Sequence, residues 1–288
     1  MSTNEPSDLH CLVTGATSGI GEAIATQLAA QGAHVIAVAR NPERGEAATA
    51  RIRRIVPDAQ IEVMTADLSV MGDVESLADR VTEHWDRLDV LILNAGVARP
   101  RRELTPDGFE VDFATNHLSA FLLCQRLGDL LCASAPARIV TISSSGHKHV
   151  KRVDFDGLAT GENFHHLRTY SITKLLTILF TTELARQLVG TGVTANAADP
   201  GFVHTSLGRD APAPFSLFLR AAQIFQLSPD KAARTPVYLA TSPEPAVDTG
   251  GYYAKSRSTK PSSLAQDQAA AARLWSLSTD LLTRKAPR

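Results

Sequence analysis

The sequence Leu9-His10-Cys11-Leu12-Val13, continued by Thr14-Gly15-Ala16-Thr17-Ser18-Gly19-Ile20-Gly21, decides the fold of this chain. Its first five residues read as a short apolar strand and the rest as a glycine-rich turn. A helical pattern follows and ends at Gly32, and residues 34–39 give a second strand. The residues on the buried face of that helix are Ala23, Ile24, Leu28 and Ala29. This order predicts a nucleotide-binding βαβ unit, because the glycines let a pyrophosphate approach the free N–H groups of the helix.

The end of the second strand distinguishes NAD from NADP. An acidic side chain there accepts hydrogen bonds from the 2′-hydroxyl of an NAD ribose and repels a 2′-phosphate. This strand closes as Val38-Ala39-Arg40-Asn41, without a carboxylate, and the Arg40 guanidinium can pair with a phosphate. The sequence therefore favours NADP(H) over NAD(H). The alternative is that Arg40 is a solvated residue at a strand end.

Two further strands end in polar residues near the expected nucleotide. Residues 61–65 run into Ala66-Asp67-Leu68, where Asp67 could meet the adenine edge or cap the next helix. Residues 90–93 run into Asn94-Ala95-Gly96. The glycine lets the backbone come close to a nucleotide, and Asn94 can tie neighbouring strands together.

Residues 107–132 predict one long helix with an apolar face. Asn116 and His117 lie in the middle of that face. A buried amide needs hydrogen-bond partners, so this placement is unusual. A functional role for Asn116 and a purely structural one are equal alternatives.

Polar residues also mark the ends of the fifth and sixth strands. Residues 138–142 run into Ser143-Ser144-Ser145-Gly146, and residues 193–198 run into Asp199-Pro200-Gly201. Open α/β sheets bind their ligands at the carboxyl ends of the strands. We therefore expect the three serine hydroxyls to face a ligand.

The segment Tyr170-Ser171-Ile172-Thr173-Lys174 opens a long, mostly buried helix that continues to residue 188. Residues four apart share a helix face, so Tyr170 and Lys174 project side by side. A free phenol has a pKa of about 10, and a neighbouring ammonium lowers that pKa by favouring the phenolate. The spacing predicts a tyrosine acid/base, although the same pair also occurs by chance on surface helices.

Strands and helices alternate along the chain without a linker or repeat. The later elements are a helix at residues 229–240, a strand at 251–253 and a helix at 264–282. This predicts an α/β fold, a single doubly wound Rossmann-type domain over residues 1–288 with a parallel sheet of about seven strands flanked by helices. Residues 8–200 form the expected cofactor-binding and catalytic core. Residues 202–227 form the expected substrate lid, whose apolar content favours a bulky apolar ligand.

Composition excludes several classes of protein. The 288 residues are 44% hydrophobic and carry a net charge of −1, which argues against a nucleic-acid binder. Three scattered cysteines, a polar N-terminus and no apolar run near the ~18 residues of a membrane span predict a cytoplasmic protein without a span. The pairs His147-x-His149 and His165-His166 lack a third ligand, so we expect solvated histidines and no metal.

The order of these motifs resembles the short-chain dehydrogenase/reductase family over nearly the whole chain. The matching motifs are Thr14-Gly15-x-x-x-Gly19-x-Gly21, Asn94-Ala95-Gly96, the serine after the fifth strand, Tyr170-x-x-x-Lys174 and Pro200-Gly201. Within the family the chain is most similar to the retinol-dehydrogenase-like branch, through residues 108–110, 116–118, 175–188 and 242–244. It departs at Leu93, where relatives often have a second asparagine, and at Asp199.

The resemblance implies a role for each matching residue. Tyr170 is the general acid/base, Lys174 depresses its pKa and binds the nicotinamide ribose, and Asn116 supports a water that relays protons to Lys174. Ser144 holds the reacting carbonyl, with Ser143 or Ser145 as the alternative. The residues implied in cofactor binding, besides Tyr170 and Lys174, are Gly15, Ser18, Ile20 and Gly21 at the pyrophosphate and ribose, Arg40 at the 2′-phosphate, Asp67 and Leu68 at the adenine, Asn94 and Gly96 at the centre, and Pro200, Val203 and Thr205 at the nicotinamide.

The implied reaction is hydride transfer between a nicotinamide and a carbonyl carbon, with proton transfer through Tyr170. We expect NADPH-dependent reduction of a bulky apolar ketone or aldehyde of a terpenoid, steroid or polyketide type. The alternative is an NADP(H)-binding regulator or scaffold without turnover, against which the intact Ser144, Tyr170 and Lys174 argue. The lid could instead touch a membrane or a partner chain, and a homodimer or homotetramer remains open.

Overall fold

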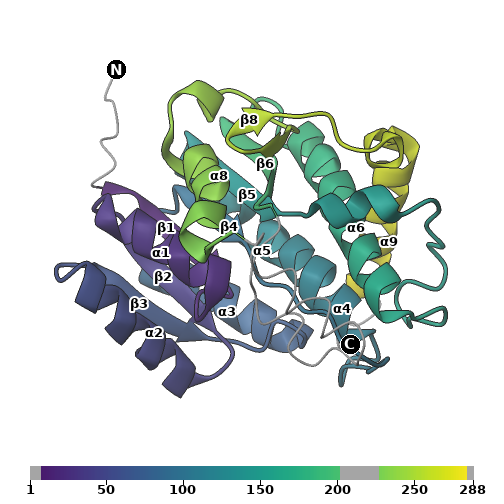
Figure 1. Ribbon diagram of the computed structural model, residues 1–288, viewed down its shortest axis with the longest axis horizontal. Coiled ribbons are helices and arrows are strands. Elements are labelled where there is room, and N and C mark those ends of the chain that lie inside the picture. The colour runs from purple at the N-terminus through teal and green to yellow at the C-terminus, as the bar shows by residue number, and fades with distance from the viewer. Residues whose placement is uncertain (1–7, 202–226, 284–288) are drawn as a thin grey trace.

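The computed structural model describes residues 8–201 and 227–283, and within them one eight-stranded sheet forms the centre of the molecule (Figure 1). The strand order is β3-β2-β1-β4-β5-β6-β7-β8. The strands are β1 His10–Thr14, β2 His34–Ala39, β3 Ile61–Thr65, β4 Val90–Leu93, β5 Ala137–Ile142, β6 Val193–Asp199, β7 Tyr252–Ala254 and β8 Arg257–Ser258. All neighbours from β3 to β7 pair in parallel, and β8 pairs antiparallel with β7. The predicted doubly wound α/β fold is confirmed, with an antiparallel strand added at one edge.

Helices cover both faces of the sheet. On one face lie α1 Gly19–Ala30, α2 Pro42–Ile55 and α8 Pro229–Thr241; on the other lie α3 Met71–His84, α5 Ser119–Ala133, α6 His166–Gln187 and α9 Gln268–Thr283. Strand β1 shows why both faces need cover. Cys11 and Val13 pack into the core under α1, and Leu12 packs into the core on the opposite side, because successive strand residues point to opposite faces.

The strand order reverses between β1 and β4. The chain continues from β1 to β2 and β3 on one side, whereas β4 begins the run towards β8 on the other. The carboxyl ends of β1 and β4 therefore diverge at a crevice, the place where open α/β sheets bind ligands. Thr14 and Asn94 lie at this point of the sheet.

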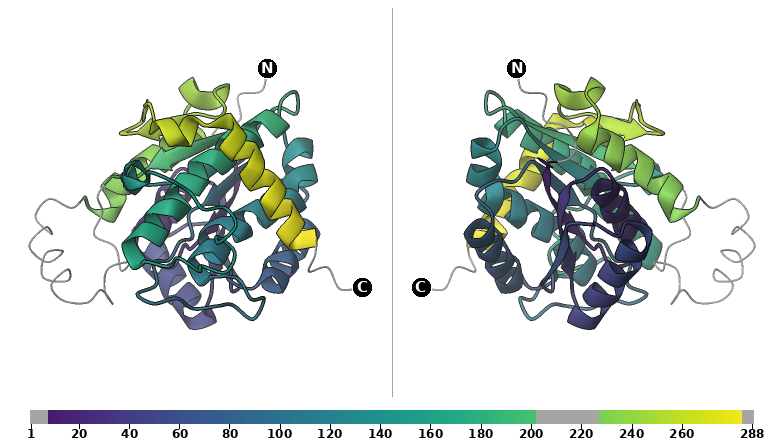
Figure 2. Two further views of the ribbon diagram at one scale, coloured as in Figure 1. Left: turned by 90° about the vertical axis from the view of Figure 1, so that its right-hand side faces the viewer. Right: turned by 90° about the vertical axis from the view of Figure 1, so that its left-hand side faces the viewer.

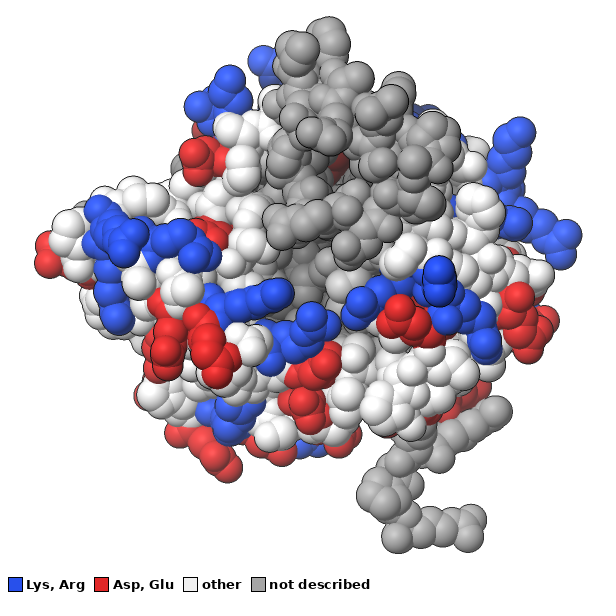
Figure 3. All heavy atoms as spheres, turned by 60° about the horizontal axis from the view of Figure 1, so that its bottom comes forward, with Lys and Arg blue, Asp and Glu red and all other residues white. Residues whose placement is uncertain are grey.

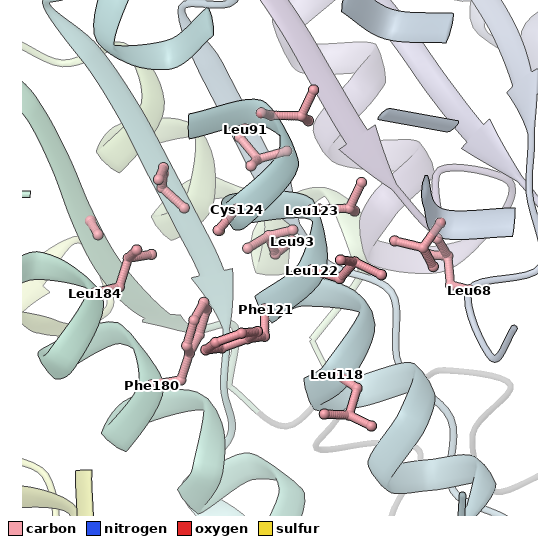
Figure 4. Packing of buried hydrophobic residues seen from close by; sticks show 14 of the residues in the cluster. Leu68, Leu91, Leu93, Leu118, Phe121, Leu122, Leu123, Cys124, Phe180 and Leu184 are labelled. Atoms are coloured by element: carbon pink, nitrogen blue, oxygen red, sulfur yellow. The ribbon is translucent and has the colours of Figure 1, made fainter. Parts of the chain in front are cut away.

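Helix α6 is the most enclosed helix of the second face. α9 lies across it (Figure 2), and Trp275 of α9 stacks on Phe180 of α6 with ring centroids 6.1 Å apart. Phe121 of α5 faces Phe180 at 5.9 Å (Figure 4) and meets Trp275 edge-on at 4.9 Å. Each such aromatic pair contributes roughly 0.5–1.5 kcal/mol beyond the area it buries. Both α5 and α9 thus pack against α6, the helix that carries Tyr170 and Lys174.

The predicted long helix over residues 107–132 is present, but it begins later, at Val111, and includes a π-helical turn. Gly108 takes φ +81°, and Leu104 and Glu110 form an isolated antiparallel bridge. A short helix α4, Val111–Phe113, starts where the Glu110 carboxylate accepts the N–H groups of Asp112 and Phe113. A π-helical turn at Ala114–Leu118 then leads into α5.

The C-terminal part also differs in detail from the prediction. A 3₁₀ turn, Ser263–Gln266, precedes α9, so the expected helix from residue 264 is divided. The predicted lid, apart from Leu227, lies outside the described residues. None of the helices within residues 8–201 and 227–283 is long and apolar enough to cross a membrane.

Candidate active site

The glycine-rich turn leaves the start of α1 open. Ser18 is the exposed N-cap residue, and its side chain makes no capping hydrogen bond. Gly19 takes φ +57°, which side-chain-bearing residues rarely adopt, and no atom of the described residues lies within 4 Å of where its Cβ would be. Gly21 packs tightly, since a Cβ there would lie 2.2 Å from Gly15 O and 2.4 Å from Asn94 Nδ2. The turn therefore packs closely against the sheet through Gly21. Its outer side and the first N–H groups of α1 stay available to bind an anion.

Asn94 ties β4 to β1, as predicted. Its Nδ2 donates to Thr14 O at 2.9 Å, and its N–H donates to Thr14 Oγ1 at 2.9 Å. Thr14 Oγ1 also accepts from Ala95 N at 3.0 Å and donates to Ile92 O at 3.2 Å. The crevice between the two strand ends is thereby fixed before any ligand binds.

The predicted adenine side is more exposed. Arg40 at the end of β2 is exposed and makes no hydrogen bond or ion pair with any described residue. Asn41 Oδ1 caps α2 by accepting Arg44 N at 2.9 Å. Asp67 Oδ1 accepts both the N–H of Ser69, at 2.9 Å, and its hydroxyl, at 2.7 Å, so its carboxylate shapes the turn before α3. The local structural alternative for Asp67 fits these contacts.

The remaining predicted cofactor residues lie at different depths. Ile20 is partly buried against the core under α1, and Leu68 packs its side chain into the opposite core, which leaves its backbone to face a ligand. Pro200 is buried directly after β6. Val203 and Thr205 lie outside the described residues.

Lys174 links α6 to the sheet beside Tyr170. Its side chain is 5% exposed, and Nζ donates to Ile142 O at 2.8 Å. The same nitrogen lies 5.6 Å from the centre of the Tyr170 ring. A Cβ on Gly96 would come within 3.4 Å of it. Tyr170 and Lys174 thus lie side by side, as the helical spacing predicted. The Lys174 ammonium also lies close to Gly96 in the turn after β4.

The three serines after β5 divide into distinct roles. Ser143 is buried, and its hydroxyl donates to Lys174 O at 2.8 Å. Ser145 is exposed. Ser144 is half-buried, accepts Gly146 N at 3.2 Å and hydrogen-bonds the Tyr170 side chain. Of the three alternatives, Ser144 alone meets Tyr170 in this way.

The protonation of the pair differs from the expectation. Burial raises the pKa of Tyr170 to about 12, and Asp199 and Asp112 add to the increase, whereas the hydrogen bond with Ser144 lowers it. Burial lowers the pKa of Lys174 to about 8, partly offset by Asp199. The expected depression of the Tyr170 pKa by Lys174 is therefore absent in the protein alone, because burial and two carboxylates outweigh an ammonium that binds a carbonyl.

Asn116 is fully engaged in the π-helical turn. Its Oδ1 accepts Val97 N at 2.7 Å, and its Nδ2 donates to Val97 O at 2.8 Å and to Thr173 Oγ1 at 3.0 Å. These bonds hold the segment after Gly96 against α6 and satisfy the buried amide. The structural alternative accounts for its contacts, and its predicted role in supporting a water stays a prediction.

His147 is buried, so the prediction that it is solvated is wrong. Its Nδ1 lies 2.7 Å from Ser144 O, and its Nε2 accepts Ser262 N at 3.1 Å, a pattern that requires the neutral ring with the proton on Nδ1. Burial is the main cause that lowers the pKa of His147. The ring meets Tyr252 edge-on at 5.1 Å. His147 therefore anchors the Ser144 turn to the C-terminal segment.

Two buried carboxylates near Tyr170 were not predicted as site residues. Asp112 accepts Arg99 N at 3.0 Å, and burial together with Glu110 raises the pKa of Asp112 to about 7. Asp199 was noted only as a departure from the family pattern. In both cases the sequence held a signal for a site residue, namely a carboxylate at a position predicted to be buried.

No group of His, Cys, Asp and Glu suited to a metal occurs within the described ranges. On the face shown in Figure 3, Lys and Arg are interspersed with Asp and Glu. Several of these Lys and Arg side chains follow one another in a row across the middle of that face, with Asp and Glu beside them.

Known proteins match both the sequence and the fold. The short chain dehydrogenase family matches residues 9–214. Human retinol dehydrogenase 13 is 39% identical over 282 residues, covering 96% of this chain and 85% of the relative. A crystal structure of an uncharacterized protein from Mycobacterium Paratuberculosis has a TM-score of 0.76 at 32% identity, covering 96% and 93% of the two chains. A short chain dehydrogenase from Burkholderia cenocepacia in complex with NADP has a TM-score of 0.69 at 27% identity, covering 87% and 97%.

The fold and these matches define an oxidoreductase that interconverts alcohols and carbonyls with a nicotinamide cofactor. The chain belongs to the short-chain dehydrogenase/reductase family, in its retinol-dehydrogenase-like branch. The residues present fit such a cofactor. The space outside Gly19 and the uncapped Ser18 provide room and N–H groups, and Arg40, which has no partner among the described residues, provides a cation.

Proposed function

We propose that this protein is an NADP(H)-dependent reductase of a bulky apolar ketone or aldehyde. The observation that carries the proposal is the convergence of Ser144, Tyr170 and Lys174 at the carboxyl end of β5, with Tyr170 hydrogen-bonded to Ser144. A proton donor and a second hydroxyl directed at one point suit a carbonyl oxygen that gains negative charge.

The residues would divide the work as follows. Tyr170 gives its proton to the carbonyl oxygen, and Ser144 donates a hydrogen bond to the same atom. Lys174, held by Ile142 O, contributes positive charge and a donor towards the cofactor ribose. When bound, the reduced nicotinamide supplies the hydride to the carbonyl carbon. The protein's own contribution is therefore orientation, charge and one proton.

The preference for NADP(H) rests on the end of β2. Arg40 is exposed and unpaired among the described residues, and Asn41 uses its side-chain oxygen to cap α2. No carboxylate occupies the strand end, so nothing there repels a 2′-phosphate. Solved relatives that bind NADP support the same preference.

The substrate class rests on the composition of residues 202–227, which contain four phenylalanines and, with Leu227 included, four leucines. An apolar lid favours an apolar ligand. The name of the human relative, retinol dehydrogenase 13, is in keeping with this class. A cytoplasmic location stays part of the proposal.

The test is NADPH consumption with a panel of steroid and terpenoid ketones and aldehydes, with a sugar ketone for contrast. We expect turnover of bulky apolar carbonyls and a fall of about 10³-fold in kcat for Tyr170→Phe, the size typical of a lost general acid. Tyr238→Phe, which changes a half-buried tyrosine on α8, is the matched control and should keep full activity. Cofactor binding without turnover of any panel member would favour the regulator instead.

A further inference from the structure

Asp199 is a buried carboxylate at the end of β6. Its side chain is 7% exposed, Oδ1 accepts Gly201 N at 2.8 Å and Oδ2 accepts the Tyr252 hydroxyl at 2.6 Å. Both donors are neutral, and Asp199 has no salt-bridge partner among the described residues. Its charge is therefore held in place by hydrogen bonds without being cancelled by a contacting cation.

Asp199 lies one strand away from the anchor of Lys174. Ser143 N donates to Ala198 O at 2.8 Å across β5 and β6, and Ile142, the residue before Ser143, accepts the Lys174 ammonium. The ionisable groups that sense the Asp199 charge are Tyr170 and Lys174 on α6, His147 on the turn after β5, and Tyr252 on β7. A charge in a partly dry site acts over several ångströms, because little water screens it.

We propose that Asp199 is a positioning residue whose charge, one strand away from the anchor of Lys174, sets the pH range over which Tyr170 can give a proton to the substrate oxygen or take one from it. The inference rests on the proposed roles of Tyr170 and Lys174. Reduction needs a proton on the Tyr170 oxygen, which moves to the carbonyl oxygen as the hydride joins the carbon. Oxidation needs the phenolate, which a neighbouring carboxylate opposes.

The ionisation of the pair supports this role. After burial, Asp199 is the largest cause that raises the pKa of Tyr170, followed by Asp112. Asp199 is also the group that opposes the lowering of the Lys174 pKa by burial. Asp112 acts on Tyr170 without a resolved effect on Lys174, so Asp199 alone of the two carboxylates acts on both members of the pair.

The direct test follows the ionisation of Tyr170 in Asp199→Asn, without cofactor or substrate. Asparagine keeps the shape and an acceptor oxygen while removing the charge. The chain has four tyrosines, so ¹³Cζ-tyrosine labelling gives few NMR signals, and Tyr170→Phe assigns the relevant one. We expect the pKa of Tyr170 to fall by about 1 pH unit relative to the wild type.

Tyr252→Phe is the matched control, because it removes the hydroxyl that binds Asp199 and leaves the carboxylate. It should leave the Tyr170 titration within about 0.3 unit of the wild type even if it costs thermal stability. Asp112→Asn should give a smaller downward shift than Asp199→Asn. An unmoved Tyr170 signal in Asp199→Asn overturns the proposal, and so does an equal shift in Tyr252→Phe, which would indicate a structural disturbance.

A second measurement uses the pH profile of kcat/KM for reduction. In Asp199→Asn the loss of reductase activity at alkaline pH should begin about 1 pH unit lower, and alcohol oxidation should begin at correspondingly lower pH. A shifted NMR titration without any turnover in the wild type supports the electrostatic role and counts against the proposed function alone. Turnover with an unshifted profile and titration counts against Asp199 alone.

Discussion

The catalytic and adenine sides of the candidate site differ in how firmly the chain itself holds them. On the catalytic side Lys174, Asn116 and Ser143 are buried, and each is hydrogen-bonded to backbone of another element. On the adenine side Ser18 and Arg40 are exposed, and their side chains bind none of the described residues. Chemistry depends on groups fixed in advance, whereas cofactor choice depends on one side chain that is free to change. Substitutions on the first side should reduce the rate, and those on the second should change the selectivity.

Lys174→Met should give the largest effect of the variants that follow. Methionine fills a similar buried volume and removes the ammonium, leaving Ile142 O without its donor. We expect kcat to fall about 10²–10³-fold, the usual result of removing one preorganised electrostatic group. Steady-state kinetics measures it, and Lys148→Met on the exposed turn after Ser144 is the control. If Lys174→Met kept a tenth of the activity, the catalytic side would not depend on this charge.

Gly21→Ala tests the close packing of the glycine-rich turn against Asn94, between the catalytic and adenine sides. The added methyl would lie 2.2 Å from Gly15 O, so the turn or α1 must move. Overpacking of this kind costs about 1–3 kcal/mol, which urea unfolding can measure, and NADPH binding should weaken as well. Gly72→Ala is the matched control in the first turn of α3, because nothing lies within 4 Å of its Cβ position. A Gly21→Ala protein as stable as Gly72→Ala would disprove the close packing.

Arg40→Ala should act on the adenine side alone. Loss of a charge-assisted pair with the 2′-phosphate costs about 1.5–3 kcal/mol, or roughly 10- to 150-fold in NADPH affinity, while NADH should bind as before. Fluorescence titration with both cofactors measures the difference. Arg53→Ala, in the last turn of α2, serves as the control, because the Arg53 guanidinium already donates to Ile61 O. Equal losses for NADPH and NADH would refute the phosphate contact.

Asp112→Asn should produce the smallest effect, on stability rather than rate. The pKa of Asp112 is raised to about 7 from 3.8, so the folded state prefers the neutral acid. The stability that the neutral Asp112 carboxyl provides is complete below the pKa that this group has in the unfolded chain. It is lost as the pH rises through about 7.

Asparagine does not ionise, so the stability of Asp112→Asn relative to the wild type should increase by about 1 kcal/mol between acid pH and pH 8. Urea unfolding at a series of pH values measures the difference. The exposed Asp58→Asn is the control. A difference that does not change with pH would show that folding does not raise the pKa of Asp112.

The same contrast explains what could be predicted from sequence. Glycine spacing, apolar strands and the Tyr170–Lys174 interval are local signals, so they predicted the sheet, most of its helices and the placement of Tyr170 beside Lys174. The burial of His147 depends on Ser262, 115 residues further along the chain, and no local pattern contains that contact. The ionisation of Tyr170 depends on Asp112 and Asp199, which lie on other elements. The predicted start of the helix at residue 107 was wrong, because Gly108 and the Glu110 cap make the helix begin at Val111.

The π-helical turn Ala114–Leu118 makes the site more sensitive to deletion than to substitution. A π turn holds one residue more than an α-helical turn, and each α-helical residue rotates the chain by about 100°. Loss of a single residue before Asn116 would let the turn relax to α-helix and rotate Asn116 away from Val97 and Thr173, while α5 kept its packing. Among descendants of this gene, changes of length between Glu110 and Asn116 should therefore be eliminated even where changes of residue type survive.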